Sequence, residues 1–213
     1  MSRTEQTGRN RSLVLAAARR VFLARGYHAA SVDQIADEAG FSKGVVYSQF
    51  DGKADMFLAL LEDRITERAA QNAQLAAKIA GTGDFTRLLD DAMRAEQGAP
   101  GWRLLVTEFR VLAARDPELN KRYAAAHART VDGVASLLAA IAEGSAGPLP
   151  LPPRPLAELL LGLEAGLALE QVANPGALDG RHVADMLASL QGWLASGAAA
   201  GAARGAARTR SQT

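Results

Sequence analysis

Cysteine is absent from the 213-residue chain. Its absence excludes disulfides, thiolate-bound zinc, iron–sulfur clusters and a cysteine nucleophile. The three histidines, His28, His127 and His182, lie far apart in the chain, and none stands at the spacing of metal ligands. We therefore expect neither a bound metal nor another cofactor.

Long apolar runs are absent as well. The longest stretch without charge, residues 186–203, is mainly Ala, Gly and Ser, and it is too weakly apolar and slightly too short to span a bilayer. The apolar stretch 12–18 is followed at once by Arg19 and Arg20, so it continues as an amphipathic helix rather than as a secretory signal. These features predict a soluble, cytoplasmic protein that makes no membrane contact.

Aromatic residues are few (6 Phe, 3 Tyr and 2 Trp), and no proline precedes Pro100. Alanine supplies much of the apolar content, which favours helix over strand. Every long segment has the helical period, and none alternates like a strand. We therefore predict an all-α fold with helices at about 10–25, 31–40 and 43–50, followed by a long helix that starts after Asp51 and is ended by Gly81 and Gly83. Further helices are expected in four places: one capped by Asp84, one with Trp102 to Leu112 on a single face, one that begins at Asp116-Pro117-Glu118 and carries apolar residues up to Ile141, and a closing pair at about 156–172 and 179–196.

The net charge of +1 hides an uneven distribution. Residues 1–53 contain 8 Lys and Arg against 5 Asp and Glu, residues 54–197 contain 13 against 18, and residues 198–213 contain 3 arginines and no acid. A basic N-terminal unit on an acidic body favours contact of that end alone with a polyanion. The excess is small enough to arise by chance, so charge alone leaves the partner open.

Residues 31–50 are predicted to form two short helices joined by a tight turn. Ser31 and Gln34 stand at capping-box spacing, Gly40 suits a left-handed turn, and Ser42 can cap the second helix. The residues expected to be buried are Ile35, Ala36, Ala39, Val46 and Phe50. A hairpin of this kind either only packs or presents its second helix to the major groove of DNA.

The second helix of this hairpin carries groups that suit DNA. Lys43 and Gln49 can read the edges of guanine and adenine, Gly44 lets the backbone approach a phosphate, and Tyr47 can donate its hydroxyl to one. Lys53 stands in the first turn of the next helix, where a cation opposes the helix dipole. A nearby phosphate would explain Lys53, and the alternative is a solvated lysine.

Specific motifs run through residues 10–60. They are Arg20-Val21-Phe22, Gly26-Tyr27, Ser31-Val32, Ile35-Ala36, Ala39-Gly40-Phe41-Ser42, Gly44-Val45-Val46-Tyr47-Ser48-Gln49-Phe50, Lys53 and Met56-Phe57. This quarter of the chain resembles the N-terminal domain of TetR-family transcriptional regulators. The resemblance implies that Gly44, Tyr47 and Lys53 meet the DNA backbone, and that Lys43, Val45, Ser48 and Gln49 lie at or near the bases.

The chain departs from the family pattern at two of these positions. Val45 stands where Thr or another polar residue is frequent, and Ser48 where Arg or an aromatic residue is frequent. We therefore expect base recognition to depend on Lys43 and Gln49, with Val45 in contact with a thymine methyl group. The candidate DNA contacts are Ser31, Ser42, Lys43, Gly44, Val45, Tyr47, Ser48, Gln49 and Lys53.

The resemblance further implies a homodimer on a near-palindromic DNA operator, with a small-molecule effector bound in the C-terminal helices. The sequence then divides into a flexible segment 1–9, a helix-turn-helix domain 10–52, a ligand-binding and dimerisation domain 53–197 and a disordered tail 198–213. Gly162 and Gly166 leave a flat face for close contact with another helix, and the predicted last helix has a wide apolar stripe. Packing of both faces within one chain is the alternative.

Large or polar side chains on inward faces are the candidates for the ligand pocket. They are Met93, Trp102, Phe109, Tyr123, His127, Leu163, Leu167 and Gln171. Each is also typical of an ordinary core, and His127 in particular could be a hydrogen-bonded core histidine.

These residues predict a regulator, most simply a repressor, that a small and mainly apolar molecule releases from its operator. The alternative is an all-helical carrier or enzyme in which the hairpin is structural. No nucleophile motif or phosphate loop supports an enzyme, so we predict no catalytic site. Salt-dependent affinity for DNA would separate the two classes, because a carrier has no reason to show it.

Overall fold

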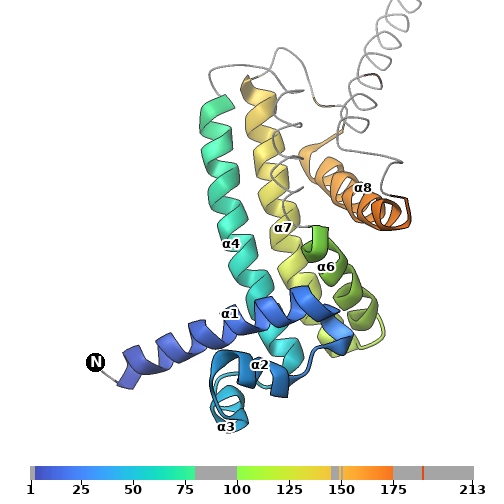
Figure 1. Ribbon diagram of the computed structural model, residues 1–213. Helices are drawn as coiled ribbons and strands as arrows, with labels where there is room; N and C mark the ends of the chain where they lie inside the picture. Colours follow the sequence, from blue (N-terminus) through green and yellow to red (C-terminus); the bar gives the residue numbers. More distant parts are fainter. Residues whose placement is uncertain (1–2, 80–99, 145–148, 150, 175–188, 190–213) are drawn as a thin grey trace, which may run out of the picture.

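The computed structural model describes residues 3–79, 100–144, 149, 151–174 and 189. Every regular element in these ranges is an α-helix (Figure 1), and the all-α prediction is confirmed. The helices are α1 (Arg3–Ala29), α2 (Val32–Ala39), α3 (Lys43–Tyr47), α4 (Lys53–Ile79), α6 (Pro100–Ala113), α7 (Pro117–Gly144) and α8 (Pro153–Ala173).

Some helix boundaries differ from the prediction. Helix α1 begins at Arg3 rather than near residue 10, and α3 ends at Tyr47 rather than at Phe50. Helix α8 begins at Pro153, three residues before the predicted start at 156, because proline is tolerated in the first turn of a helix. The predicted helix that is capped by Asp84, the predicted helix 179–196 apart from Ser189, and the tail 198–213 lie outside the described residues. The flexibility of residues 1–9 stays a prediction.

Helix α2 forms where the local sequence predicts it. The Ser31 hydroxyl accepts a hydrogen bond from the Gln34 amide at 3.2 Å, and the Gln34 side-chain oxygen accepts one from the Ser31 amide at 3.1 Å. Gly40 ends the helix with φ +72°, a conformation that residues with a Cβ resist. Ile35, Ala36, Val46 and Phe50 are buried as predicted, and Ala39 is half-buried.

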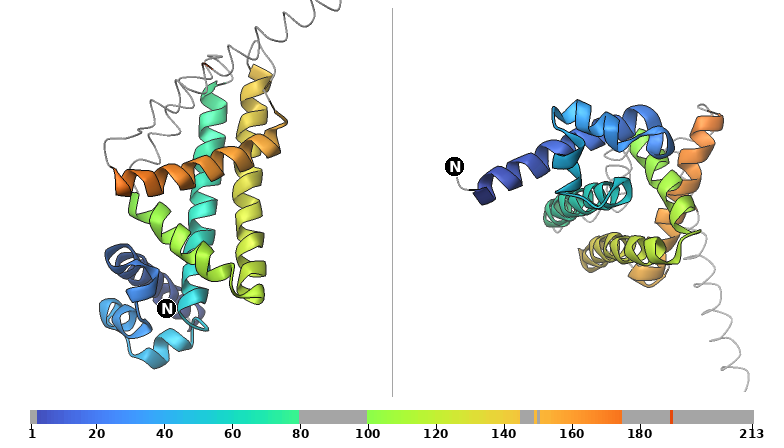
Figure 2. Two further views of the ribbon diagram at one scale, coloured as in Figure 1. Left: turned by 90° about the vertical axis from the view of Figure 1, so that its right-hand side faces the viewer. Right: turned by 90° about the horizontal axis from the view of Figure 1, so that it is seen from below.

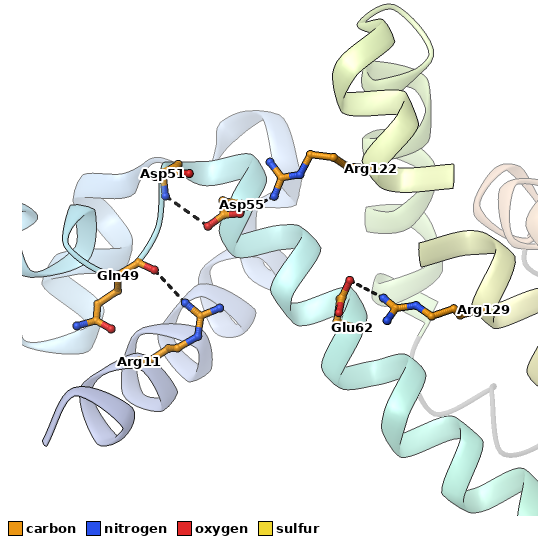
Figure 3. A network of polar contacts seen from close by, with 7 residues as sticks. All are labelled: Arg11, Gln49, Asp51, Asp55, Glu62, Arg122 and Arg129. Carbon is orange, nitrogen blue, oxygen red and sulfur yellow. Dashed lines mark hydrogen bonds and ion pairs between the residues drawn. The ribbon is translucent and has the colours of Figure 1, made fainter. Parts of the chain in front are cut away.

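The body is built on α4 and α7, which run side by side in the same direction away from the N-terminal helices (Figure 1). Arg122 of α7 pairs with Asp55 of α4 at 2.6 Å, and Arg129 pairs with Glu62 about two turns further along both helices (Figure 3). Helix α8 crosses α7 and packs against α6 as well (Figure 2). Helix α7 begins at Pro117, where the Asp116 carboxylate accepts from the Glu118 and Leu119 amides.

One hydrophobic core joins the N-terminal helices to the body. Ring centroids of Phe22 and Phe57 lie 5.9 Å apart, those of Phe57 and Phe109 4.3 Å, and those of Phe109 and Tyr123 5.9 Å. These contacts pass from α1 through α4 and α6 to α7. The core therefore continues across residues 52 and 53, where the sequence predicted a change of domain. None of the described helices is long and apolar enough to cross a membrane.

Candidate nucleic-acid interface and ligand cavity

Helix α3 presents a polar face to solvent. Ser42, Lys43, Gly44, Tyr47 and Ser48 are exposed, with 55% of the Tyr47 surface accessible. The opposite face is buried in the core through the side chains of Val46 and Phe50. Val45 and Gln49 are half-buried at the edge between the two faces. A short helix anchored on one side and polar on the other is the arrangement that a recognition helix requires.

Several candidate DNA contacts already have partners within the chain. Lys43 pairs with Asp33 of α2 at 2.7 Å, and this hydrogen bond raises the pKa of the exposed Lys43 ammonium. The Ser48 hydroxyl donates to the Val45 carbonyl at 2.8 Å, and the Ser31 hydroxyl belongs to the capping box. Ser42 occupies the N-cap position of α3 without a side-chain cap hydrogen bond. The surface contacts of Lys43 and Ser48 can be exchanged for DNA groups at little cost because solvent already screens them.

Arg11 of α1 binds the backbone just after the end of α3. The spacing of residues in the local sequence does not predict this contact. Its guanidinium donates to the Gln49 carbonyl at 2.9 Å and lies 4.2 Å from the centre of the Phe50 ring. Figure 3 shows this side chain reaching across from α1. Arg11 therefore fixes the backbone at Gln49, one of the two predicted base-reading residues.

Lys53 lies at a junction between α1 and α4. Its ammonium donates to the carbonyls of Tyr27 at 2.8 Å, His28 at 3.2 Å and Ala30 at 2.9 Å, and it lies 4.6 Å from the centre of the Tyr27 ring. An ammonium has three donors, and these carbonyls account for all of them. Burial lowers the pKa of Lys53, and the nearby Glu108 carboxylate opposes that shift. The carbonyls at the end of α1 explain this cation without a phosphate.

Glu108 connects α6 to the same junction. Its carboxylate accepts from the Tyr27 amide at 2.7 Å and from the His28 amide at 3.4 Å. Helix α1 breaks at Gly26, which has φ +76°, and a Cβ at that position would come within 2.9 Å of the Glu108 carboxylate. The glycine thus permits both the break in α1 and the close approach of α6.

A cavity of about 170 Å³ lies between α4, α6, α7 and α8. Of the eight predicted ligand residues, Trp102, Tyr123 and His127 line it. Phe109 is fully buried in the aromatic core instead. Leu163, Leu167 and Gln171 are half-buried on α8 away from the cavity wall, and Met93 lies outside the described residues.

The cavity wall includes charged residues that the sequence analysis did not select. They are Arg64 and Arg68 of α4, Arg103 and Arg110 of α6, and Glu164 of α8. Glu164 has a side chain that is only 21% exposed and pairs with Arg103 at 3.5 Å. One sequence pattern could have indicated these residues: arginine recurs on the inward-facing sides of two predicted helices. Arginine is ordinarily a surface residue, so the pattern alone was weak.

The remaining wall combines apolar and neutral polar groups. Leu61, Ile65, Val106, Val134, Leu161 and Ala165 supply the apolar part. The Tyr123 and His127 rings stack at 5.8 Å. Burial lowers the pKa of His127, and Arg110 adds to that shift, so the imidazole is neutral at pH 7. Burial also raises the pKa of Tyr123, so the wall offers neutral hydrogen-bonding groups beside its arginines.

The outer face of α8 is an exposed apolar strip. Leu159, Leu169 and Val172 are 56%, 48% and 61% exposed. Gly162 and Gly166 lie on the same helix, and a Cβ at either would meet nothing within 4 Å. Within the described ranges, no group of three His, Asp or Glu side chains could hold a metal ion.

Two family models match the chain, and together they cover most of it. The model of bacterial regulatory proteins of the tetR family matches residues 14–60, which include the exposed α3. The model of the C-terminal domain of BetI-type transcriptional repressors matches residues 82–195, more than half of the chain. The chain belongs to the TetR family of bacterial transcriptional regulators.

Characterised HTH-type transcriptional regulators match parts of the chain. The HTH-type transcriptional activator FasR of Mycolicibacterium smegmatis is 38% identical in an alignment of 113 residues that covers 48% of this chain and 50% of that protein. The HTH-type transcriptional repressor AcnR of Corynebacterium diphtheriae is 28% identical over 132 residues, 62% of this chain and 64% of that protein. The chain thus spans about half of FasR and under two thirds of AcnR.

Solved structures of transcriptional regulators share the fold at low sequence identity. FadR of Bacillus subtilis in complex with stearoyl-CoA is 17% identical, with a TM-score of 0.56 and coverage of 84% of this chain and 96% of that one. A transcriptional regulator from Saccharomonospora viridis in complex with choline is 19% identical, with a TM-score of 0.65 and coverage of 85% and 95%. The ligands of these two neighbours differ in charge and size, so the shared fold does not specify a ligand.

Proposed function

We propose that this TetR-family chain is a ligand-responsive, DNA-binding regulator that acts as a homodimer on a near-palindromic operator. In this proposal residues 10–52 bind DNA, and residues 53–197 bind the ligand and dimerise. The α3 surface carries the proposal, because Lys43, Tyr47 and Ser48 are exposed on a helix whose other face is fixed in the core. Such a helix can enter the major groove with its side chains against base edges and phosphates.

Dimerisation is supported by the apolar strip on α8. A helix-turn-helix protein reads a near-palindrome with two copies whose recognition helices are held about one DNA turn, or roughly 34 Å, apart. The open space at Gly162 and Gly166 allows a second helix to approach closely, and the exposed leucines supply apolar surface to bury. Contact between two α8 helices would bury this apolar surface and hold the two recognition helices at a fixed separation.

A response to a ligand is supported by the contacts of the cavity walls. Helix α6 holds the end of α1 through Glu108, and α7 holds the start of α4 through the pair of Arg122 with Asp55. Asp55 in turn accepts from the Asp51 amide at 3.4 Å, next to the end of the helix-turn-helix (Figure 3). A small, mainly apolar molecule that binds more tightly to a state with a different α6 position would disfavour DNA binding.

Repression is the direction we propose, since the matching C-terminal model is that of a repressor type. In a purified transcription reaction the protein should lower transcription from its operator promoter, and an effective ligand should restore it. Increased transcription on adding the protein would instead support activation, which is the activity named for FasR.

Fluorescence anisotropy with operator DNA at 50 to 200 mM salt tests DNA binding. The logarithm of the association constant should fall linearly with the logarithm of salt concentration, with a slope of about −0.9 for each phosphate contacted. A carrier or an enzyme with a structural hairpin would show neither operator affinity nor this slope. Wild-type protein without measurable operator affinity at 50 mM salt would refute the proposal.

A further inference from the structure

We infer that the cavity binds a compact amphipathic anion, with an acidic head group at Arg103 and an apolar body against Trp102 and the aliphatic wall. This inference rests on the proposed function, because it names the ligand class of the same cavity. It is carried by the charge of the wall, the state of Arg103 and the size of the space.

The described wall is strongly cationic. Four arginines, Arg64 and Arg68 on α4 and Arg103 and Arg110 on α6, face one carboxylate, Glu164, among the described lining residues. His127 adds no further positive charge because its imidazole is neutral at pH 7. Arginines gathered beside apolar walls raise the local potential, and an anion entering this space is attracted more strongly than it would be in water.

Arg103 is the best-placed of these cations to bind an acid. Its side chain is 13% exposed, and its Nε is buried without a hydrogen-bond acceptor. Its ion pair with Glu164 is long, at 3.5 Å from Nη1 to the carboxylate. A buried donor without an acceptor is destabilising, whereas Nε and Nη together form a planar fork that binds a carboxylate or phosphate with two hydrogen bonds.

Glu164 lies beside the position that a ligand head group would take, with its carboxylate 3.5 Å from Nη1 of Arg103. The two carboxylates would repel each other, so the ligand must displace Glu164 from Arg103 or share the guanidinium with it. Displacement would release a contact between α8 and α6, the helix whose Glu108 holds the end of α1. The acid would therefore act on the same helix that contacts the DNA-binding part.

The size of the cavity limits the apolar body. A volume of about 170 Å³ is comparable to an engineered cavity of roughly 150 Å³ that accommodates benzene. The Trp102 indole and the stacked Tyr123 and His127 rings line this space. An aryl acid or a short-chain acid fits these dimensions, and its head group can reach the arginines on α6.

Isothermal titration with matched pairs of acid and alcohol tests the ligand class. The probes are benzoate and benzyl alcohol, phenylacetate and 2-phenylethanol, and hexanoate and 1-hexanol. At least one acid should bind at least tenfold more tightly than its alcohol. Alcohols that bind as tightly as their acids, or no acid binding at 10 mM, would overturn the inference. Titrations with phenyl phosphate and hexanoyl-CoA are compared with those of benzoate and hexanoate. The tightest-binding probe shows whether the acidic group is a carboxylate, a phosphate or part of a larger carrier.

Variants of the cavity arginines test the site itself. Arg103→Met and Arg110→Met should each weaken acid binding at least tenfold and leave alcohol binding unchanged. Glu164→Gln should strengthen acid binding, because the competing carboxylate is lost. Arg154→Met is the matched control, since Arg154 pairs with Asp132 on the surface outside the cavity wall. Wild-type affinity for the acids in both Arg103→Met and Arg110→Met would overturn the inference. If Arg103→Met does not fold, the acid affinity of Arg110→Met alone tests the inference.

Operator binding measured in parallel separates the two proposals. An acid that binds the cavity but does not alter operator affinity supports the ligand class and contradicts the proposed response. A neutral compound that releases the operator where its acid does not supports the response and contradicts the ligand class.

Discussion

Lys53, a single side chain at the start of α4, fixes the position of α4 against the end of α1. Its ammonium binds three carbonyls at the end of α1, where backbone acceptors have no partner in the helix itself. Glu108 satisfies the amides of Tyr27 and His28 beside the same ammonium. The two side chains therefore complete the hydrogen bonding of a broken helix end that would otherwise face the core.

Replacement of Lys53 by Met should destabilise the fold. Loss of the charged hydrogen bonds should lower the free energy of unfolding by about 1.5–3 kcal/mol, measured by urea denaturation. Lys43→Met is the control, and it should cost under about 1 kcal/mol because the Lys43 pair with Asp33 is exposed. The salt slope of DNA binding should change little in Lys53→Met. A slope lower by about one with unchanged stability would make Lys53 a phosphate contact instead.

Tyr47 and Gln49 should differ in what they contribute to DNA binding. Tyr47→Phe should weaken binding to all DNA sequences alike, because the exposed hydroxyl is expected to contact phosphate. Gln49→Ala should change base preference at one operator position by about 1–3 kcal/mol. Selection from a randomised operator library measures both effects. An unaltered base preference in Gln49→Ala would remove Gln49 from the base-reading residues.

His127 should make stability depend on pH. Burial and Arg110 hold its pKa below the ordinary 6.5, although Glu158 partly opposes the shift. As pH falls through 6.5 the unfolded chain binds a proton that the folded chain does not, so wild type should lose stability. Urea denaturation between pH 5 and 8 should show a smaller loss in His127→Gln. Equal pH profiles for His127→Gln and wild type would contradict the assignment.

At the scale of the helix, α8 has one face that packs against the body and one that is exposed. Leu156, Ala157 and Ala168 are buried against the body, while Leu159, Leu169 and Val172 remain exposed. The inner face also carries Glu164 toward Arg103. An exposed apolar strip beside a buried face is typical of a surface that contacts another molecule. Contact with a second copy would cover it.

Gly162→Leu should convert dimers to monomers without unfolding the chain. A Cβ at Gly162 has nothing within 4 Å, so the larger side chain should not disturb packing inside one subunit. In a dimer it would hold the two α8 helices apart. Sedimentation should show monomers with a nearly unchanged melting temperature, and operator affinity should fall. A variant that remains dimeric would place the interface elsewhere.

At the scale of the whole molecule, the helix-turn-helix and the helices around the cavity share one core. Phe57 of α4 contacts aromatic rings of α1 and α6, and Trp102 stacks on it at 5.9 Å. Trp102 also lines the cavity. A change in the cavity can therefore reach α1 through packed rings, because a close-packed interior transmits displacement instead of absorbing it.

Phe109→Ala should damage both parts together. Phe109 is fully buried between Tyr27, Phe57 and Tyr123, so its truncation leaves a void that its neighbours cannot fill. The expected loss is about 3–5 kcal/mol in the free energy of unfolding, with operator affinity lost in parallel. A variant with wild-type stability and altered ligand response would instead place Phe109 at the ligand site.

Local sequence determined the helical class and the helix-turn-helix. The Ser31–Gln34 capping box, the Gly40 turn and the Asp116-Pro117 helix start depend on neighbours within four residues, so their spacing could be recognised before folding. The periodic burial of Ile35, Val46 and Phe50 followed for the same reason.

Only the tertiary structure decided which side chains meet. Lys53 finds carbonyls 26, 25 and 23 residues away, and Arg11 reaches a carbonyl 38 residues away. Trp102 and Phe109 stand on one apolar stripe of the sequence, yet the packing of α6 puts Trp102 at the cavity and Phe109 in the core. Helical periodicity identifies an inward face, but the rotation and crossing of packed helices determine what each residue on that face touches.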